Sequence, residues 1–273
     1  KAIKPILLGV SLFSILPLGA QVFDKPRSLA EADSLDRVQY RVLYQLDFIS
    51  DPTDREYVTQ DQVRLDIGTQ ISKVYSLKHY QADSAATPLI ETGQFPRKIV
   101  TDVVPPMILY RGYPKTQDIT TDYRLPAGAP VMSYVEPKPT LQWQVKPEKR
   151  EILGHSCQRA EVSFGGRQWI AWFTSEIPLS EGPYKFGGLP GLILEVADSE
   201  GDYRYTCIGI ANLSAGENIV RWKWNQRPTT RKELEKIIVQ LYANPEQAIK
   251  ALGGRMGFKG DPMLNLPYNP IEK

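Results

Sequence analysis

Alternation of apolar and polar residues is the clearest pattern in this chain, and residues 38–48 show it best. Every second position there is apolar or aromatic, and the positions between are mostly polar. A period of two places the apolar set on one face, so this stretch predicts a half-buried β-strand. Shorter strands are expected at residues 62–67 and 70–77, joined by a turn around Gly68.

A β-hairpin is predicted at residues 158–174. Two alternating segments flank Gly165-Gly166, and a glycine pair is typical of a two-residue hairpin turn. The register set by this turn places Arg159 opposite Trp172. Stacking of the guanidinium on the indole would then stabilise the pair.

The pattern changes from strands to helices near the end of the chain. A second hairpin is expected at residues 192–210 and a further strand at residues 218–224. Thr230 and Glu233 then match a capping box, and apolar residues follow at helical spacing. A second short helix is expected to begin at residues 244–245, an Asn-Pro pair.

The remaining segments carry weaker signals. Residues 21–36 read as a mobile lead-in, and residues 83–92 show no regular period. Prolines are frequent between residues 103 and 139, which favours edge strands and long loops packed on the sheet. The chain therefore predicts a mainly β (α+β) fold, with a curved antiparallel sheet and two C-terminal helices, in one domain over residues 21–273.

Residues 1–20 have the organisation of a secretory signal peptide. Lys1 and Lys4 precede an apolar core at residues 6–18, and small residues lead to a cleavage position near Ala20. The core is short for a membrane span. We therefore expect an exported protein, periplasmic, outer-membrane associated or secreted, with no integral membrane span after cleavage.

Export changes the meaning of the net charge. The chain has 33 basic and 31 acidic residues. Removing residues 1–20 removes Lys1 and Lys4 and no acidic residue, which leaves the rest formally neutral. The basic pI is thus no evidence for nucleic acid as a partner.

Only two cysteines occur, Cys157 and Cys207. An even number in an exported chain favours a disulfide between them. The alternative is a pair of buried free thiols.

Groups for nucleophilic catalysis are scarce. His155 is two residues from Cys157, so both side chains could share one face of a strand. A surface histidine is the alternative interpretation, and a disulfide at Cys157 would exclude a cysteine nucleophile. Glu181 and Glu195 are the acidic residues nearest to the glycine-rich stretch. Glu195 interrupts an apolar run, so it either faces solvent or pairs with a cation such as Arg204.

Metal-ligand spacings are also missing from the sequence. It contains no Cys-x-x-Cys or His-x-His pattern. Asp198, Glu200 and Asp202 alternate around a glycine, but the spacing fits a solvated β-turn better than a calcium loop. We expect neither a metal nor an organic cofactor.

The stretch GPYKFGGLPGLILEV at residues 182–196 is dense in glycine. Its glycines precede a predicted strand, whereas a phosphate loop leads into a helix. Residues 189–192 fit a type II turn instead, with proline and then glycine in the centre. Whether the glycines serve the bend or a ligand stays open. The residues expected to touch a ligand here are Gly187, Gly188, Leu189, Pro190, Gly191 and Leu192.

These motifs together resemble the GLPGLI family of exported Bacteroidetes proteins. The resemblance rests on EILGHSCQRAEVSF, RQWIAWFTSEIPLSEGPYKF, GGLPGLILEV and the ending YNPIE. It implies export and a β-rich fold. The family is one of unknown function, so the resemblance supplies no catalytic residues. In architecture it is similar to open lipoprotein-carrier half-barrels of the LolA type.

The scarcity of catalytic groups beside 14 Tyr, 8 Phe and 5 Trp favours a non-catalytic binding protein for an apolar or peptide-like ligand. One alternative is an envelope hydrolase or maturation enzyme that uses His155 or the nearby glutamates. Another is a structural module that docks to an outer-membrane complex through residues 103–139.

Overall fold

A computed structural model describes residues 25–94, 106–126, 128–213, 216–253 and 266–273 of this chain. The predicted signal segment at residues 1–20 and its cleavage position lie outside these ranges. All statements on the structure refer to the described residues.

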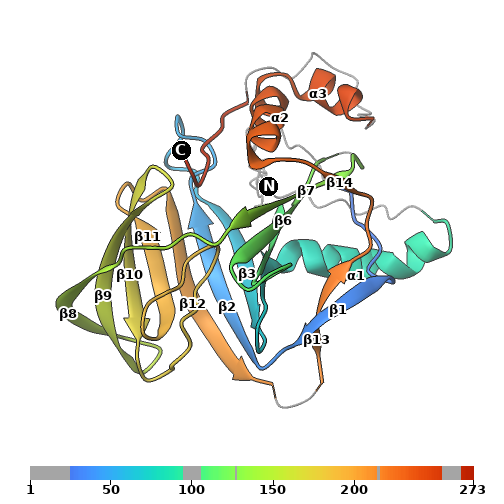
Figure 1. Ribbon diagram of the computed structural model, residues 1–273. Coiled ribbons are helices and arrows are strands. Elements are labelled where there is room, and N and C mark those ends of the chain that lie inside the picture. The colour runs from blue at the N-terminus through green and yellow to red at the C-terminus, as the bar shows by residue number, and fades with distance from the viewer. Residues whose placement is uncertain (1–24, 95–105, 127, 214–215, 254–265) are drawn as a thin grey trace, which may run out of the picture.

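A curved, open antiparallel sheet of 12 strands dominates the molecule (Figure 1). In spatial order its strands are β14 (Gln226–Pro228), β7 (Val131–Pro137), β6 (Asp118–Arg124), β5 (Met107–Arg111), β4 (Ser72–Ser76), β3 (Thr59–Ile67), β2 (Tyr40–Phe48), β12 (Tyr203–Asn212), β11 (Leu192–Asp198), β10 (Arg167–Thr174), β9 (His155–Phe164) and β8 (Gln144–Ile152). Among the strand pairs formed by the described residues, the short edge pair β14–β7 alone is parallel. The predicted β-rich fold is therefore confirmed.

The hairpin between β9 and β10 has the predicted register. Arg159 lies opposite Trp172, and Gly165 and Gly166 both have positive φ, at +58° and +74°, as the two-residue turn requires. The predicted stacking partner is wrong, however. It is the guanidinium of Arg150 on β8 that lies over the Trp172 ring, at 4.2 Å.

Arg159 forms ion pairs with carboxylates instead of stacking on the indole. Its guanidinium pairs with Glu148 at 2.8 Å and with Glu161 on its own strand. Two acidic neighbours on the exposed face therefore compete successfully with the indole.

The lead-in at residues 21–36 is not mobile throughout. Residues 32–37 form β1 (Ala32–Arg37), which pairs with β13 (Asn218–Trp222) in a separate two-stranded sheet. The carboxylate of Asp36 accepts hydrogen bonds from the amides of Gln70 and Ile71, at 2.7 and 2.9 Å. These bonds tie the lead-in to the β3–β4 turn.

A third helix, α1 (Leu77–Glu91), covers the stretch where no period was found. Ser76 caps it by accepting a hydrogen bond from the amide of His79. The residues that α1 buries are His79, Asp83 and Ala86, so it has no apolar stripe. A helix that buries polar groups gives no periodic hydrophobic signal, and this is why the sequence did not reveal it.

Strands in the proline-rich region lie inside the sheet, which corrects the prediction of edge strands there. β5 and β6 each have a hydrogen-bonded neighbour on both sides. Pro106 precedes β5, Pro114 lies in the loop after it, and Pro137 ends β7. Because these prolines fall outside the ladders or at their ends, the missing N–H groups break no central pairing.

The two C-terminal helices are confirmed. α2 (Arg231–Ala243) begins with the predicted capping box of Thr230 and Glu233, and α3 (Pro245–Ala251) is capped by Asn244. The buried stripe of α2 joins a cluster with residues of β6 and β7. The members of the stripe are Leu234, Ile238 and Leu241. Within the described ranges, no helix has the length and apolar character to cross a membrane.

Candidate functional site

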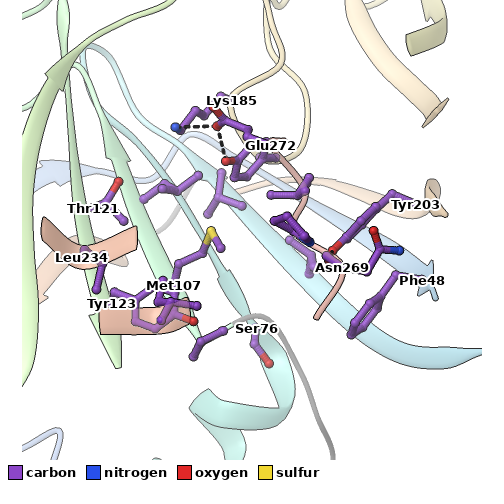
Figure 2. Close-up of a pocket in the computed structure, with 18 of the residues that line it drawn as sticks. Phe48, Ser76, Met107, Thr121, Tyr123, Lys185, Tyr203, Leu234, Asn269 and Glu272 are labelled. Atoms are coloured by element: carbon purple, nitrogen blue, oxygen red, sulfur yellow. Dashed lines mark hydrogen bonds and ion pairs between the residues drawn. The ribbon is translucent and has the colours of Figure 1, made fainter. Parts of the chain in front are cut away.

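A cavity of about 160 Å³ lies between the sheet, α2 and the last residues of the chain (Figure 2). Met107 of β5, Tyr123 of β6 and Leu234 of α2 line it together. Strands β2 to β7 and β12 all contribute lining residues. α2 and the C-terminal residues thus enclose the cavity against this part of the sheet.

Tyrosines form much of the wall. The lining tyrosines are Tyr75, Tyr123, Tyr134, Tyr184, Tyr203, Tyr205, Tyr242 and Tyr268. Burial raises the pKa of Tyr123 and Tyr205 well above the ordinary value of 10, so their hydroxyls stay neutral. The wall therefore offers aromatic faces together with neutral donors and acceptors, which suits an aromatic ligand.

One end of the cavity is charged. The Lys185 ammonium lies 2.6 Å from a Glu136 oxygen and 2.7 Å from Glu272, and Arg231 reaches the other Glu272 oxygen at 2.7 Å. Tyr184 also donates its hydroxyl hydrogen to Glu272. Arg231 also pairs with Glu235 of its own helix at 2.7 Å, so two cations face three carboxylates in this cluster.

Glu272 is the acidic residue on which this cluster converges. Burial alone would raise its pKa, but Lys185, Tyr184 and Arg231 lower the pKa below the ordinary value of 4.5. A carboxyl group with a lowered folded-state pKa stabilises the fold above its unfolded-state pKa. That contribution is lost as the pH falls through the folded-state pKa.

We therefore expect the wild type to exceed a Glu272→Gln variant in free energy of unfolding at pH 7, and the difference to shrink as the pH falls below 4.5. Glutamine keeps an acceptor oxygen but cannot titrate, so the variant isolates the charge. Urea unfolding at several pH values between 7 and 3 measures the difference. A gap that stays constant over this range would contradict the role of the Glu272 charge.

The glycine-rich stretch reaches the cavity through residues other than the six predicted ones. Tyr184 and Lys185 line the cavity, whereas residues 187–192 are absent from the lining that the described ranges provide. Leu189 and Leu192 are buried in the main core. The structure thus brings the start of the stretch, and not its centre, to the cavity.

Close backbone packing accounts for the central glycines. A Cβ atom on Gly191 would lie 2.0 Å from the Thr174 carbonyl oxygen, and one on Gly187 would lie 3.0 Å from that of Ser180. Gly188 has open space around it but a φ of +85°. The first two glycines allow close approach of two backbones, and the third permits the bend.

The predicted type II turn at residues 189–192 is wrong. The Gly191 amide donates to the Leu189 carbonyl at 2.8 Å, which is a tighter three-residue turn centred on Pro190. The Leu192 amide donates to the Ile177 carbonyl at 3.0 Å. Because this neighbouring segment takes the amide, the hydrogen bond of a four-residue turn does not form.

The predicted disulfide is also wrong, since Cys157 and Cys207 are buried free thiols. Burial raises the pKa of each to about 11, so both are protonated at neutral pH. His155 pairs with Glu176 at 2.7 Å through its Nδ1 atom, on a partly exposed surface. A protonated thiol beside this pair is a poor nucleophile.

The two predicted glutamates are held by cations. Glu181 pairs with Arg111 and accepts a hydrogen bond from the Ser72 hydroxyl at 3.2 Å. Glu195 pairs with Arg204 at 2.8 Å, which is one of the two alternatives predicted for it. It also pairs with Arg150, again at 2.8 Å.

The acidic turn at residues 198–202 is not simply solvated. Asp198 and Asp202 are buried, and only Glu200 is exposed. The Arg167 guanidinium lies 2.6 Å from Asp198 and 2.8 Å from Asp202. An arginine therefore supplies the positive charge that a bound metal would otherwise bring.

Arg167, Lys185 and Glu272 were not identified from the sequence. Each is a single charged residue in a motif noted for other features: Arg167 follows Gly165-Gly166, Lys185 lies in GPYKFGG, and Glu272 lies in the ending YNPIE. Sequence spacing could not bring them together, because Lys185 and Glu272 are 87 residues apart.

Comparisons with known proteins give a usable match for one part of this chain only, residues 166–195. No curated protein matches it. Two solved structures, "Structure of PNGF-II in P21 space group" and "Structure of PNGF-II in C2 space group", each share 13% identity with it at a TM-score of 0.49. Each likeness covers 75% of this chain, which spans only about a third of those proteins, 34% and 33%. A likeness of this degree supports no inference about the chain.

A family model described as "Protein of unknown function (Porph_ging)" matches residues 166–195. The match runs from the β9–β10 turn through Tyr184 and Lys185 into β11. It overlaps the motifs that resemble the GLPGLI family, although the model does not carry that name. Residues 166–195 are thus similar to a family of proteins of unknown function.

Proposed function

We propose that this protein is a non-catalytic binding protein, exported to the cell envelope or secreted, whose cavity accepts one apolar ring-sized group. The ligand is a small aromatic molecule or an apolar side chain of a peptide. The tyrosine-walled cavity of about 160 Å³ is the observation that carries this proposal. Export rests on the signal-peptide pattern of residues 1–20.

The size of the cavity limits its ligand. An apolar cavity of roughly 150 Å³ in another protein holds a benzene molecule. About 160 Å³ therefore suits one aromatic ring with a small substituent. Met107 lies at the centre of the lining in Figure 2, and its flexible side chain can adjust to the shape of the ring.

The chemistry around the cavity favours binding over catalysis. Lys185 and Glu272 neutralise each other at 2.7 Å, so neither is a free acid or base. His155, Glu181 and Glu195, on which the hydrolase alternative depended, do not line the cavity within the described ranges. Docking through residues 103–139 gains no support either, because β5 and β6 are paired on both sides.

Filling the cavity should weaken ligand binding at least tenfold without unfolding the protein. We expect 4-methylphenol to bind the wild type saturably, and a Met107→Trp variant to bind it at least tenfold more weakly, since the indole would occupy the space of the ring. Isothermal titration calorimetry measures both affinities. Val239→Trp is the matched control, because Val239 lies on α2 and is 55% exposed.

Two outcomes would contradict the proposed function. One is that 4-methylphenol and indole both fail to bind the wild type saturably. The other is that Met107→Trp binds as tightly as Val239→Trp, which would place the binding outside the cavity.

A further inference from the structure

Residues 268–273, here called the docked segment, are held along their length by other parts of the fold, yet they belong to no helix or strand. Asn269 is buried, and both ends of its side-chain amide are hydrogen-bonded. Its side-chain oxygen accepts from Arg167 at 2.7 Å, its side-chain nitrogen donates to the Ile49 carbonyl at 2.8 Å, and its own carbonyl accepts from the Tyr203 hydroxyl. An asparagine with both ends of its amide engaged is recognised specifically.

The next residue is recognised through its backbone. Arg167 donates a second hydrogen bond, at 2.8 Å, to the Pro270 carbonyl. One guanidinium thus binds two successive residues of the docked segment, while its other nitrogen is fixed by Asp198 and Asp202. The two aspartates therefore orient the Arg167 guanidinium independently of the docked segment.

Glu272 is held by a second group of residues. Tyr184, Lys185 and Arg231 all bind its carboxylate. Tyr184 adopts a φ of +53°, a conformation uncommon for residues other than glycine. The hydroxyl of this residue lies against the Glu272 carboxylate.

The Gly165-Gly166 turn also fits the docked segment. A Cβ atom on Gly165 would lie 2.7 Å from the Glu272 side chain, and one on Gly166 would lie 2.9 Å from the Cβ of Lys273. The Gly165 carbonyl accepts a hydrogen bond from the Lys273 amide at 2.7 Å. The turn thus forms a smooth surface on which a backbone can lie.

The charges around Glu272 favour a carboxylate at this position. The buried Lys185 ammonium pairs with Glu136 and Glu272, and the neighbouring Arg231 pairs with Glu136, Glu235 and Glu272. Glu272 thus supplies one of the two carboxylates that bind the buried Lys185 ammonium, so a neutral side chain in its place would weaken the pairing of a buried charge.

We propose that this surface is a peptide-recognition site for an extended Asn-Pro-apolar-Glu sequence. Residues 269–272 occupy it within the chain, and a partner protein that presents the same sequence exchanges with them. Arg167 and the Ile49 carbonyl select the asparagine side chain, and Lys185, Arg231 and Tyr184 select the glutamate. This inference does not rest on the cavity binding a small ligand.

A labelled peptide tests the proposal. The probe is a fluorescein-tagged LPYNPIEK, the sequence of residues 266–273. It is added to the full-length wild type and to a full-length Asn269→Ala/Glu272→Gln variant, whose own segment is weakened. The segment within the chain competes at an effective concentration of roughly millimolar. Fluorescence anisotropy should therefore show the variant binding the peptide at least tenfold more tightly than the wild type.

Peptide variants and a label on the wild-type segment complete the test. A peptide with alanine for asparagine and glutamine for glutamate should lose at least tenfold in affinity for the variant protein. In a second experiment, a Lys273→Cys variant of the otherwise wild-type chain is labelled with a trifluoromethyl tag. The tag reacts selectively at residue 273 because the two native thiols are buried. Millimolar LPYNPIEK should move its fluorine resonance to the free position.

The proposal is overturned if the altered peptide binds as well as LPYNPIEK, or if the wild type and the double variant bind LPYNPIEK equally. A fluorine resonance unmoved by LPYNPIEK overturns it as well. The fluorine measurement does not depend on the folding of the double variant.

Discussion

Replacing Arg167 by methionine should lower the free energy of unfolding by roughly 3–5 kcal/mol, the cost of breaking a buried ion pair from one side. Arg167 has a side-chain exposure of 1% and binds Asp198 and Asp202. Burial would raise the pKa of Asp202, but hydrogen bonds from Arg167, Asn269 and Arg55 lower it to about 2. Methionine would leave two buried carboxylates with Arg55 as their nearest remaining cation.

Urea unfolding measures this loss. Arg204→Met is the matched control, because Arg204 pairs with Glu195 but is 52% exposed, and exposed pairs contribute only about 0–1 kcal/mol. Arg167→Lys should recover part of the loss, since lysine restores the charge without the planar fork. A loss below about 1.5 kcal/mol for Arg167→Met would show that the acidic turn does not depend on this guanidinium.

The elements that the sequence revealed are those with a local signal. β2 alternates over its whole length, and the glycine pair at Gly165 sets the β9–β10 register correctly. The capping box of α2 is equally local. α1 was missed for the opposite reason, because it buries His79 and Asp83 and thus lacks an apolar stripe.

The cavity needed information that no local pattern contains. Its wall combines strands from both halves of the chain with α2 and the docked segment. The GPYKFGG motif drew attention to its glycines, whereas its tyrosine and lysine reach Glu272. The ion pair joins a loop between β10 and β11 to the docked segment, 87 residues away, and cannot be read from sequence spacing.

The second large effect is expected at Gly191 of the same motif. Substitution with alanine should lower the free energy of unfolding by about 3 kcal/mol, the upper end for overpacking a tight site. The added methyl would lie 2.0 Å from the Thr174 carbonyl oxygen. Thr174 ends β10 and pairs with Leu192, so the backbone cannot move away without breaking the β10–β11 ladder.

Gly209→Ala on β12 is the matched control, because a Cβ atom there would meet nothing within 4 Å. It should change stability by less than about 1 kcal/mol, through the entropy of the unfolded chain. If Gly191 instead served a ligand, Gly191→Ala would weaken 4-methylphenol binding and leave urea unfolding unchanged. A loss of stability together with unchanged affinity in the fraction that remains folded would assign this glycine to the packing of two strands. The ligand contacts of the motif would then lie at Tyr184 and Lys185.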